Sequence, residues 1–112
     1  MKTIGVLGGL GPQATMDFEV RFHRAAQRRI PQFQNSGYPP LLVYYHRRPP
    51  FVMGPGNTPA SPVRADPGLL TAAQWLGARA ELLVMPANAP HAVQDQIERA
   101  AGCKVLSMID VT

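Results

Sequence analysis

The residues whose types suit chemistry lie at three places where an apolar run meets a turn. These places are the glycine-rich stretch 8–11, the basic stretch 46–48 and the segment 85–91. A glycine-rich turn that opens a helix presents backbone N–H groups that suit an anion. An arginine such as Arg48 can clamp a carboxylate with two hydrogen bonds, and a histidine such as His91 titrates near neutral pH. These residue types favour a small carboxylate as the ligand.

The glycine-rich stretch permits more than one interpretation. Gly9, Gly11 and Ala14 match a relaxed dinucleotide-binding fingerprint, but that fold also needs an acidic residue after the second strand to hold the ribose. No acid occurs between Glu19 and Asp66, so the sequence argues against a nicotinamide cofactor. An anion-binding turn that uses Gly9, Leu10 and Gly11, and a purely structural tight turn, both stay open.

The other polar residues also have two interpretations each. Arg48 either binds a carboxylate or is an exposed loop arginine. Asn88 either caps a helix or turns its amide toward a substrate. His91 either lies exposed in a first helical turn or takes part in proton transfer. No metal-ligand spacing is present, and we predict that Trp75 and Cys103 are packing residues.

The elements that must position these residues alternate along the chain. Apolar, β-branched runs predict strands, and three- and four-residue apolar spacing predicts helices. The predicted strands cover 3–7, 41–45, 82–85 and 104–109, and the predicted helices cover about 13–30, 66–77 and 88–101. This order predicts an α/β fold, a three-layer domain with a four-stranded parallel sheet and helices on both faces. Ligands then bind beyond the carboxyl ends of the strands.

One long connection interrupts this alternation. Residues 46–66 hold five prolines and two glycines, and a loop of this length is usually functional or disordered. Asp66 followed by Pro67 is a typical helix start, with the aspartate as N-cap. Gly102 is the expected end of the last helix.

Composition limits the class of protein. The 112 residues suit one small domain, and 46% hydrophobic with 16% charged residues is ordinary for a globular core. The net charge is +4, and its main cluster, Arg21, Arg24, Arg28 and Arg29, lacks any nucleic-acid motif, so we expect a solvated helix face and no nucleic-acid partner. A single cysteine fits a reducing cytoplasm. No run is long enough to span a membrane, and residues 1–9 do not read as a signal peptide.

Two segments together resemble a known family. The opening 3–15, TIGVLGGLGPQAT, closely resembles the start of aspartate/glutamate racemase-family proteins, where the turn typically reads Gly-Gly-Met-Gly-Pro-Glu-Ala-Thr. The segment 85–91, MPANAPH, resembles that family's Pro-Cys-Asn-Thr-Ala-His element, and 106–110 is similar to the strand that follows it. The resemblance covers most of the chain and leaves the middle loop poorly matched.

The resemblance implies a cofactor-independent racemase with two α/β lobes that face each other across a cleft. Each lobe supplies one cysteine, and the two thiols act on opposite faces of the substrate α-carbon, because inversion needs a base on each side. It also implies that the substrate lies against Gly9, Leu10, Gly11, Asn88 and Ala89. Arg48 joins this set as the candidate carboxylate clamp.

The sequence departs from this pattern in ways that matter for chemistry. Ala87 stands where the family has its first cysteine, and Ala89 replaces the usual threonine. We therefore expect residues 1–112 to form a single N-terminal lobe that does not racemise amino acids alone. The alternatives are a carboxylate-binding pseudoenzyme, and a different enzyme that uses His91. An amino acid or dicarboxylate ligand and a homodimer are expected.

Overall fold

The computed structural model describes residues 2–10, 12–29, 38–87 and 91–107. Four strands form one sheet in the order β2-β1-β3-β4, and every pairing is parallel. The predicted α/β fold with a four-stranded parallel sheet is confirmed. Along the chain the elements are β1 (Ile4–Gly8), α1 (Pro12–Gln27), β2 (Leu41–Tyr45), the short 3-10 helix η2 (Pro55–Asn57), α2 (Pro67–Gly77), β3 (Leu82–Met85), α3 (His91–Ala101) and β4 (Val105–Ser107).

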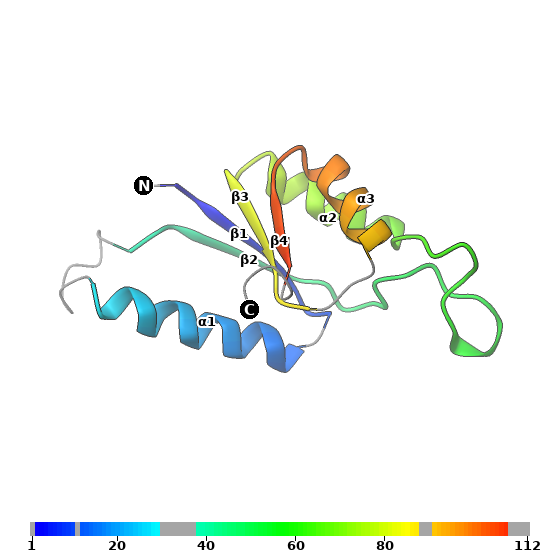
Figure 1. Cartoon of the computed structure of the whole chain (residues 1–112), viewed down its shortest axis with the longest axis horizontal. Coiled ribbons are helices and arrows are strands. Elements are labelled where there is room, and N and C mark those ends of the chain that lie inside the picture. Colours follow the sequence, from blue (N-terminus) through cyan, green and yellow to red (C-terminus); the bar gives the residue numbers. More distant parts are fainter. Residues whose placement is uncertain (1, 11, 30–37, 88–90, 108–112) are drawn as a thin grey trace.

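The helices cover both faces of the sheet (Figure 1), with α1 on one side and α2 with α3 on the other. Side chains alternate between the faces of a strand, so Leu7 and Leu83 enter the core under α2 and α3 while Val6 lies on the other face. All three side chains are fully buried. The main core therefore lies between the sheet and the α2–α3 pair.

The helix faces explain which residues are buried. In α2 the fully buried or nearly buried positions are Leu69, Ala72, Ala73 and Leu76, a spacing of three and four residues. The sequence predicted that Trp75 packs in the core, and this prediction is wrong. Trp75 is 45% exposed because it falls beside that face, and the Arg79 guanidinium lies 4.1 Å from its ring centroid.

The long connection forms an arm that leaves the sheet and returns (Figure 1). Phe51 bridges Ala65 and Met53 bridges Pro59, both antiparallel, and η2 makes the tip. The Val52 N–H donates to the Arg64 carbonyl at 2.9 Å. These backbone bonds bring the two ends of the connection together, so its first and last residues lie side by side at the sheet edge.

Several element boundaries differ from the sequence prediction by a few residues. Strands β2 and β3 have the predicted bounds, whereas α1 ends at Gln27 instead of about residue 30. The chain turns there, since the Arg29 N–H donates to the Ala26 carbonyl at 3.0 Å. Gly102 has a φ of 72°, and the end of α3 that it predicted is confirmed. None of the helices in the described ranges is long and apolar enough to span a bilayer.

Candidate functional site

The strand order reverses between β1 and β3, whose carboxyl ends lie side by side. From β1 the chain passes to β2 on one side, and later to β3 and β4 on the other. Ligands of open parallel sheets bind where the strand order reverses in this way. Val6 pairs with Val84, so the turn at Gly9 and the turn at Ala87 follow neighbouring strand ends. These are two of the segments that the sequence singled out.

The turn after β1 is held closely from two sides. Gly9 has a φ of 84°, and its N–H donates to Oγ1 of the buried Thr15 at 3.0 Å. The His46 N–H donates to the Gly8 carbonyl at 2.7 Å. The Gly9 N–H therefore has an internal acceptor, which favours a structural role for this residue. Leu10 is half-buried and packs against the core, and Gly11 lies outside the described residues.

The turn after β3 starts with the fully buried Pro86, and the next residue, Ala87, carries only a methyl group. The Ala87 N–H donates to the Met85 carbonyl at 2.8 Å, and Ala87 is half-buried. Asn88 and Ala89 lie outside the described residues. His91 is the first residue of α3, but the position of its side chain is not described.

A cluster that the sequence did not reveal lies where the arm meets the sheet. His46 follows β2, and its Nε2 lies 3.3 Å from Oδ2 of Asp66; both side chains are at least nine-tenths buried. Arg48 is 72% exposed, with Nη2 at 3.7 Å from Oδ1 of Asp66. The sequence marked His46–Arg48 as a strand end and Asp66 as a helix cap, and the arm brings them together.

Asp66 has the predicted N-cap position but does not use its side chain as a cap. Its carbonyl accepts from the N–H groups of Leu69 and Leu70, at 2.9 and 3.2 Å. Its carboxylate makes no capping hydrogen bond and faces His46 and Arg48 instead. The helix start was predicted correctly, but the reason for an aspartate there is different.

The single thiol does not belong to this site. Cys103 precedes β4 at the amino end of the sheet, and it is half-buried against the core, less covered than the sequence predicted. Desolvation, with the charge of Glu98 second, raises the pKa of the Cys103 thiol. It is therefore poorly suited to act as a thiolate base. No group of three or more metal-ligating side chains occurs among the described residues.

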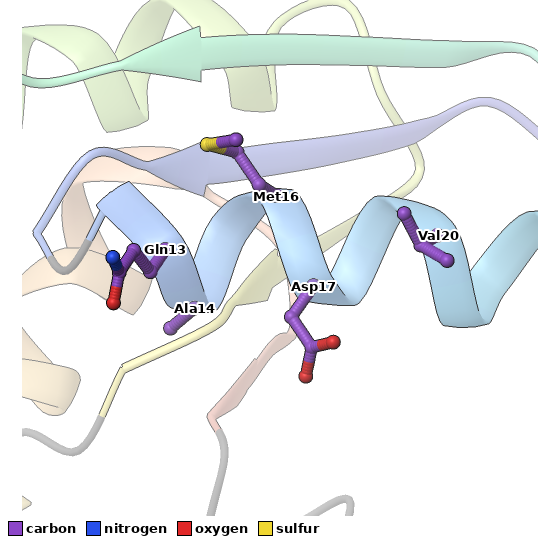
Figure 2. A pocket seen from close by; sticks show the side chains of 5 residues that line it. All are labelled: Gln13, Ala14, Met16, Asp17 and Val20. Carbon is purple, nitrogen blue, oxygen red and sulfur yellow. The ribbon is translucent and has the colours of Figure 1, made fainter.

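Helix α1 carries an open hollow of a different kind. Figure 2 shows the five side chains that line it, all from α1: Gln13, Ala14, Met16, Asp17 and Val20. Met16 and Val20 are 57% and 46% exposed. Asp17 pairs with Arg21 at 3.0 Å. This hollow is lined by a single helix and its acid is already paired, so it lacks the convergent polar groups of a ligand site.

Two solved structures have the same fold as this chain. No family profile matches the sequence. The fold matches the crystal structure of an aspartate racemase homologue from Pyrococcus horikoshii, with a TM-score of 0.73 and 29% identity over 98% of this chain and 46% of that one. It also matches an Asp/Glu racemase candidate from Yersinia pestis, with a TM-score of 0.62 and 22% identity over 100% of this chain and 47% of that one. The chain thus spans about half the length of both solved proteins.

Proposed function

We propose that the chain forms one half of a cofactor-independent amino-acid racemase site. The support is its match to aspartate/glutamate racemase homologues over almost its whole length and about half of theirs. In this proposal the half-site binds an acidic amino acid or dicarboxylate. It performs no turnover by itself, because a methyl group stands where the first thiol is expected.

The observation that carries the proposal is the reversal of strand order between β1 and β3. The turns at Gly9 and Ala87 follow neighbouring strand ends, and Arg48 comes shortly after the end of the adjacent strand β2. The proposed contacts are Leu10 and Gly11 with the guanidinium of Arg48 for one carboxylate. Gly9 shapes the turn, because its own N–H is bonded to Thr15.

The proposed roles on the β3 side follow from the family resemblance. Asn88 and Ala89 are proposed to face the substrate, and Ala87 to lie beside its α-carbon. A methyl group neither accepts nor donates a proton, so removal of the α-proton on this face needs a thiol at this position. Inversion of the centre needs in addition a second base on the far side of the α-carbon.

The test is α-proton exchange into heavy water with L-aspartate and L-glutamate, followed by NMR together with the optical purity of the amino acid. The parent chain and its Ala87→Cys variant are compared. We expect binding without exchange for the parent. For Ala87→Cys we expect exchange with retention of configuration, because one thiolate removes and returns the proton on the same face.

Two controls keep the result specific. Ala87→Ser has a similar size but no acidic thiol, and it should bind without exchange. Ala87→Cys combined with Cys103→Ala should exchange like the single variant, because Cys103 lies at the amino end of the sheet. Exchange by the parent would contradict the proposed role of Ala87 and direct attention to a histidine. Absence of binding by every variant would reject the half-site.

The second candidate is a binding module, a pseudoenzyme that holds a small dicarboxylate. Ala87 favours a binding module, because the side chain that is proposed to lie beside the α-carbon cannot transfer a proton. Binding with no exchange in either parent or Ala87→Cys is its expected result. The third candidate uses His91 as the base, and it requires an activity that His91→Ala removes.

The proposal includes a homodimer in the cytoplasm. Met16 and Val20 on α1 leave apolar surface exposed, which favours association, and the single cysteine suits a reducing compartment. Sedimentation equilibrium of the parent and of a Met16→Glu, Val20→Glu variant tests the dimer. A monomeric parent would contradict it.

A further inference from the structure

The group that the proposed function leaves unexplained is the buried acid–imidazole pair His46–Asp66. Nε2 of His46 and Oδ2 of Asp66 lie 3.3 Å apart, yet their directions do not make a hydrogen bond, and neither atom has another hydrogen-bond partner among the described residues. A buried polar atom without such a partner costs stability. Two such atoms, Nε2 of His46 and Oδ2 of Asp66, lie next to each other here, and packing alone does not explain why they are retained.

The position of Asp66 indicates what its carboxylate does. An aspartate at an N-cap normally accepts a hydrogen bond from the first turn of its helix, and this one does not. Its backbone is tied to the arm, since its N–H donates to the Pro50 carbonyl at 2.8 Å. A Cβ added at Gly68 would come within 3.0 Å of Oδ2, so the helix start closes over the carboxylate. The side chain is thus directed at the end of β2.

The third member of the cluster is the exposed one. Oδ1 of Asp66 lies 3.7 Å from Nη2 of Arg48, and the Arg48 side chain is 72% exposed. An unrestrained arginine loses much rotamer freedom when it binds. A carboxylate 3.7 Å from one end of the guanidinium restricts this freedom before the ligand arrives and leaves the other N–H donors available.

From this geometry we propose that Asp66 is a positioning residue. Its carboxylate, backed by the His46 ring, holds the Arg48 guanidinium at the strand end where a ligand carboxylate binds. The role in ligand binding rests on the half-site proposed above. The restraint of Arg48 by Asp66 is a property of the free protein and is measurable without any ligand.

The direction in which anion affinity changes when the Asp66 charge is removed distinguishes a positioning role from a purely electrostatic one. A carboxylate beside Arg48 lowers the local attraction for an anion, so its removal alone would tighten anion binding. Positioning predicts the opposite result, because Arg48 becomes free to sample other rotamers. Asp66→Asn removes the charge and keeps a residue that is favoured at an N-cap.

The experiment uses the 112-residue chain with two readouts. The first is the affinity for L-aspartate from NMR titration, and the second is the order of the Arg48 side chain from relaxation of its Nε signal without ligand. For Asp66→Asn we expect about three- to thirty-fold weaker binding and a clear loss of Arg48 order. Asp66→Ser keeps a cap but is too short to contact Arg48, and it should behave in the same way.

Matched controls complete the design. Asp17→Asn makes the same charge change in an exposed ion pair on α1, and both readouts should stay as in the parent. In an Arg48→Ala background, Asp66→Asn should no longer weaken binding, because only the electrostatic effect of the lost charge is left. Equal or tighter binding in Asp66→Asn, or unchanged Arg48 order, would overturn the positioning role.

Failure of the half-site has a different signature. If the parent binds neither L-aspartate nor L-glutamate, the proposed function is rejected. The order of Arg48 in the free parent and in Asp66→Asn still decides whether Asp66 holds that side chain. The two failures are therefore distinguishable in one set of samples.

Discussion

The hydroxyl of Tyr45 donates a 2.7 Å hydrogen bond to Oε2 of Glu19. Tyr45 ends the edge strand β2 and Glu19 lies in the middle of α1, so the bond ties the helix to the sheet. Within the described part of α1 only Thr15 is fully buried, while Met16 and Val20 are exposed. A helix with so little buried apolar surface depends more strongly on such a polar tie.

Tyr45→Phe tests that tie. It removes the hydroxyl and leaves the Glu19 carboxylate without this donor, so we expect a lower free energy of unfolding. Urea denaturation gives the value, and amide exchange in α1 should become faster. Tyr44→Phe, at a site that is 40% exposed, is the matched control and should change little. Equal losses in the two variants would contradict the prediction.

The same contact predicts a pH dependence. The hydrogen bond to Glu19, followed by desolvation and the charge of Glu19, raises the pKa of Tyr45, while Arg47 opposes this. The folded chain then holds the phenolic proton to higher pH than the unfolded chain. The stability from this group is complete below the ordinary pKa and is lost as pH rises through the raised pKa. In NMR titrations, Glu19→Gln should lower the pKa of Tyr45. An unchanged midpoint would rule out Glu19 as the cause.

Gly9→Ala should destabilise the fold through two separate effects. The φ of 84° strains any residue with a side chain, and an added Cβ would come within 2.5 Å of the His46 backbone nitrogen and oxygen. Gly56 has a φ of 69° with open space around it, so Gly56→Ala carries the strain alone, about 1–2 kcal/mol. We expect Gly9→Ala to cost clearly more in urea denaturation. Similar costs would mean that the turn relaxes away from His46.

Gly77→Ala should also destabilise, against its helix propensity. Alanine is favoured over glycine inside a helix by about 1 kcal/mol, but a Cβ at Gly77 would collide with the backbone of Ala101. Here α2 and α3 approach each other closely. We expect a net loss of about 1–3 kcal/mol from overpacking, measured by thermal unfolding. Gln74→Ala, at an exposed site of the same helix, is the control and should be neutral or stabilising.

Cys103 should react slowly with thiol reagents. Desolvation and then Glu98 raise the pKa of its thiol, so less thiolate is present at neutral pH. The rate of alkylation should rise only at a pH above the ordinary thiol range, and Glu98→Gln should shift this rise to lower pH. A midpoint at or below the ordinary range would show that Cys103 is more reactive than its surroundings imply.

Much of the fold follows from local sequence pattern. The apolar runs 41–45 and 82–85 gave strands with the predicted bounds, and Gly102 ended α3 as expected. Strand and helix periods depend on neighbouring residues, so the sequence carries them directly. The alternation of these elements is sufficient to predict a parallel sheet with helices on both faces.

Those local patterns did not predict how the elements are arranged in space. Only the tertiary structure determined the strand order β2-β1-β3-β4, the exposure of Trp75, and the contact of His46 with Asp66 across a connection of some twenty residues. Such relationships depend on which surfaces pack together, and no local period records this. The amino-acid types alone determined that position 87 has no thiol, because its chemistry follows from the side chain and not from its surroundings.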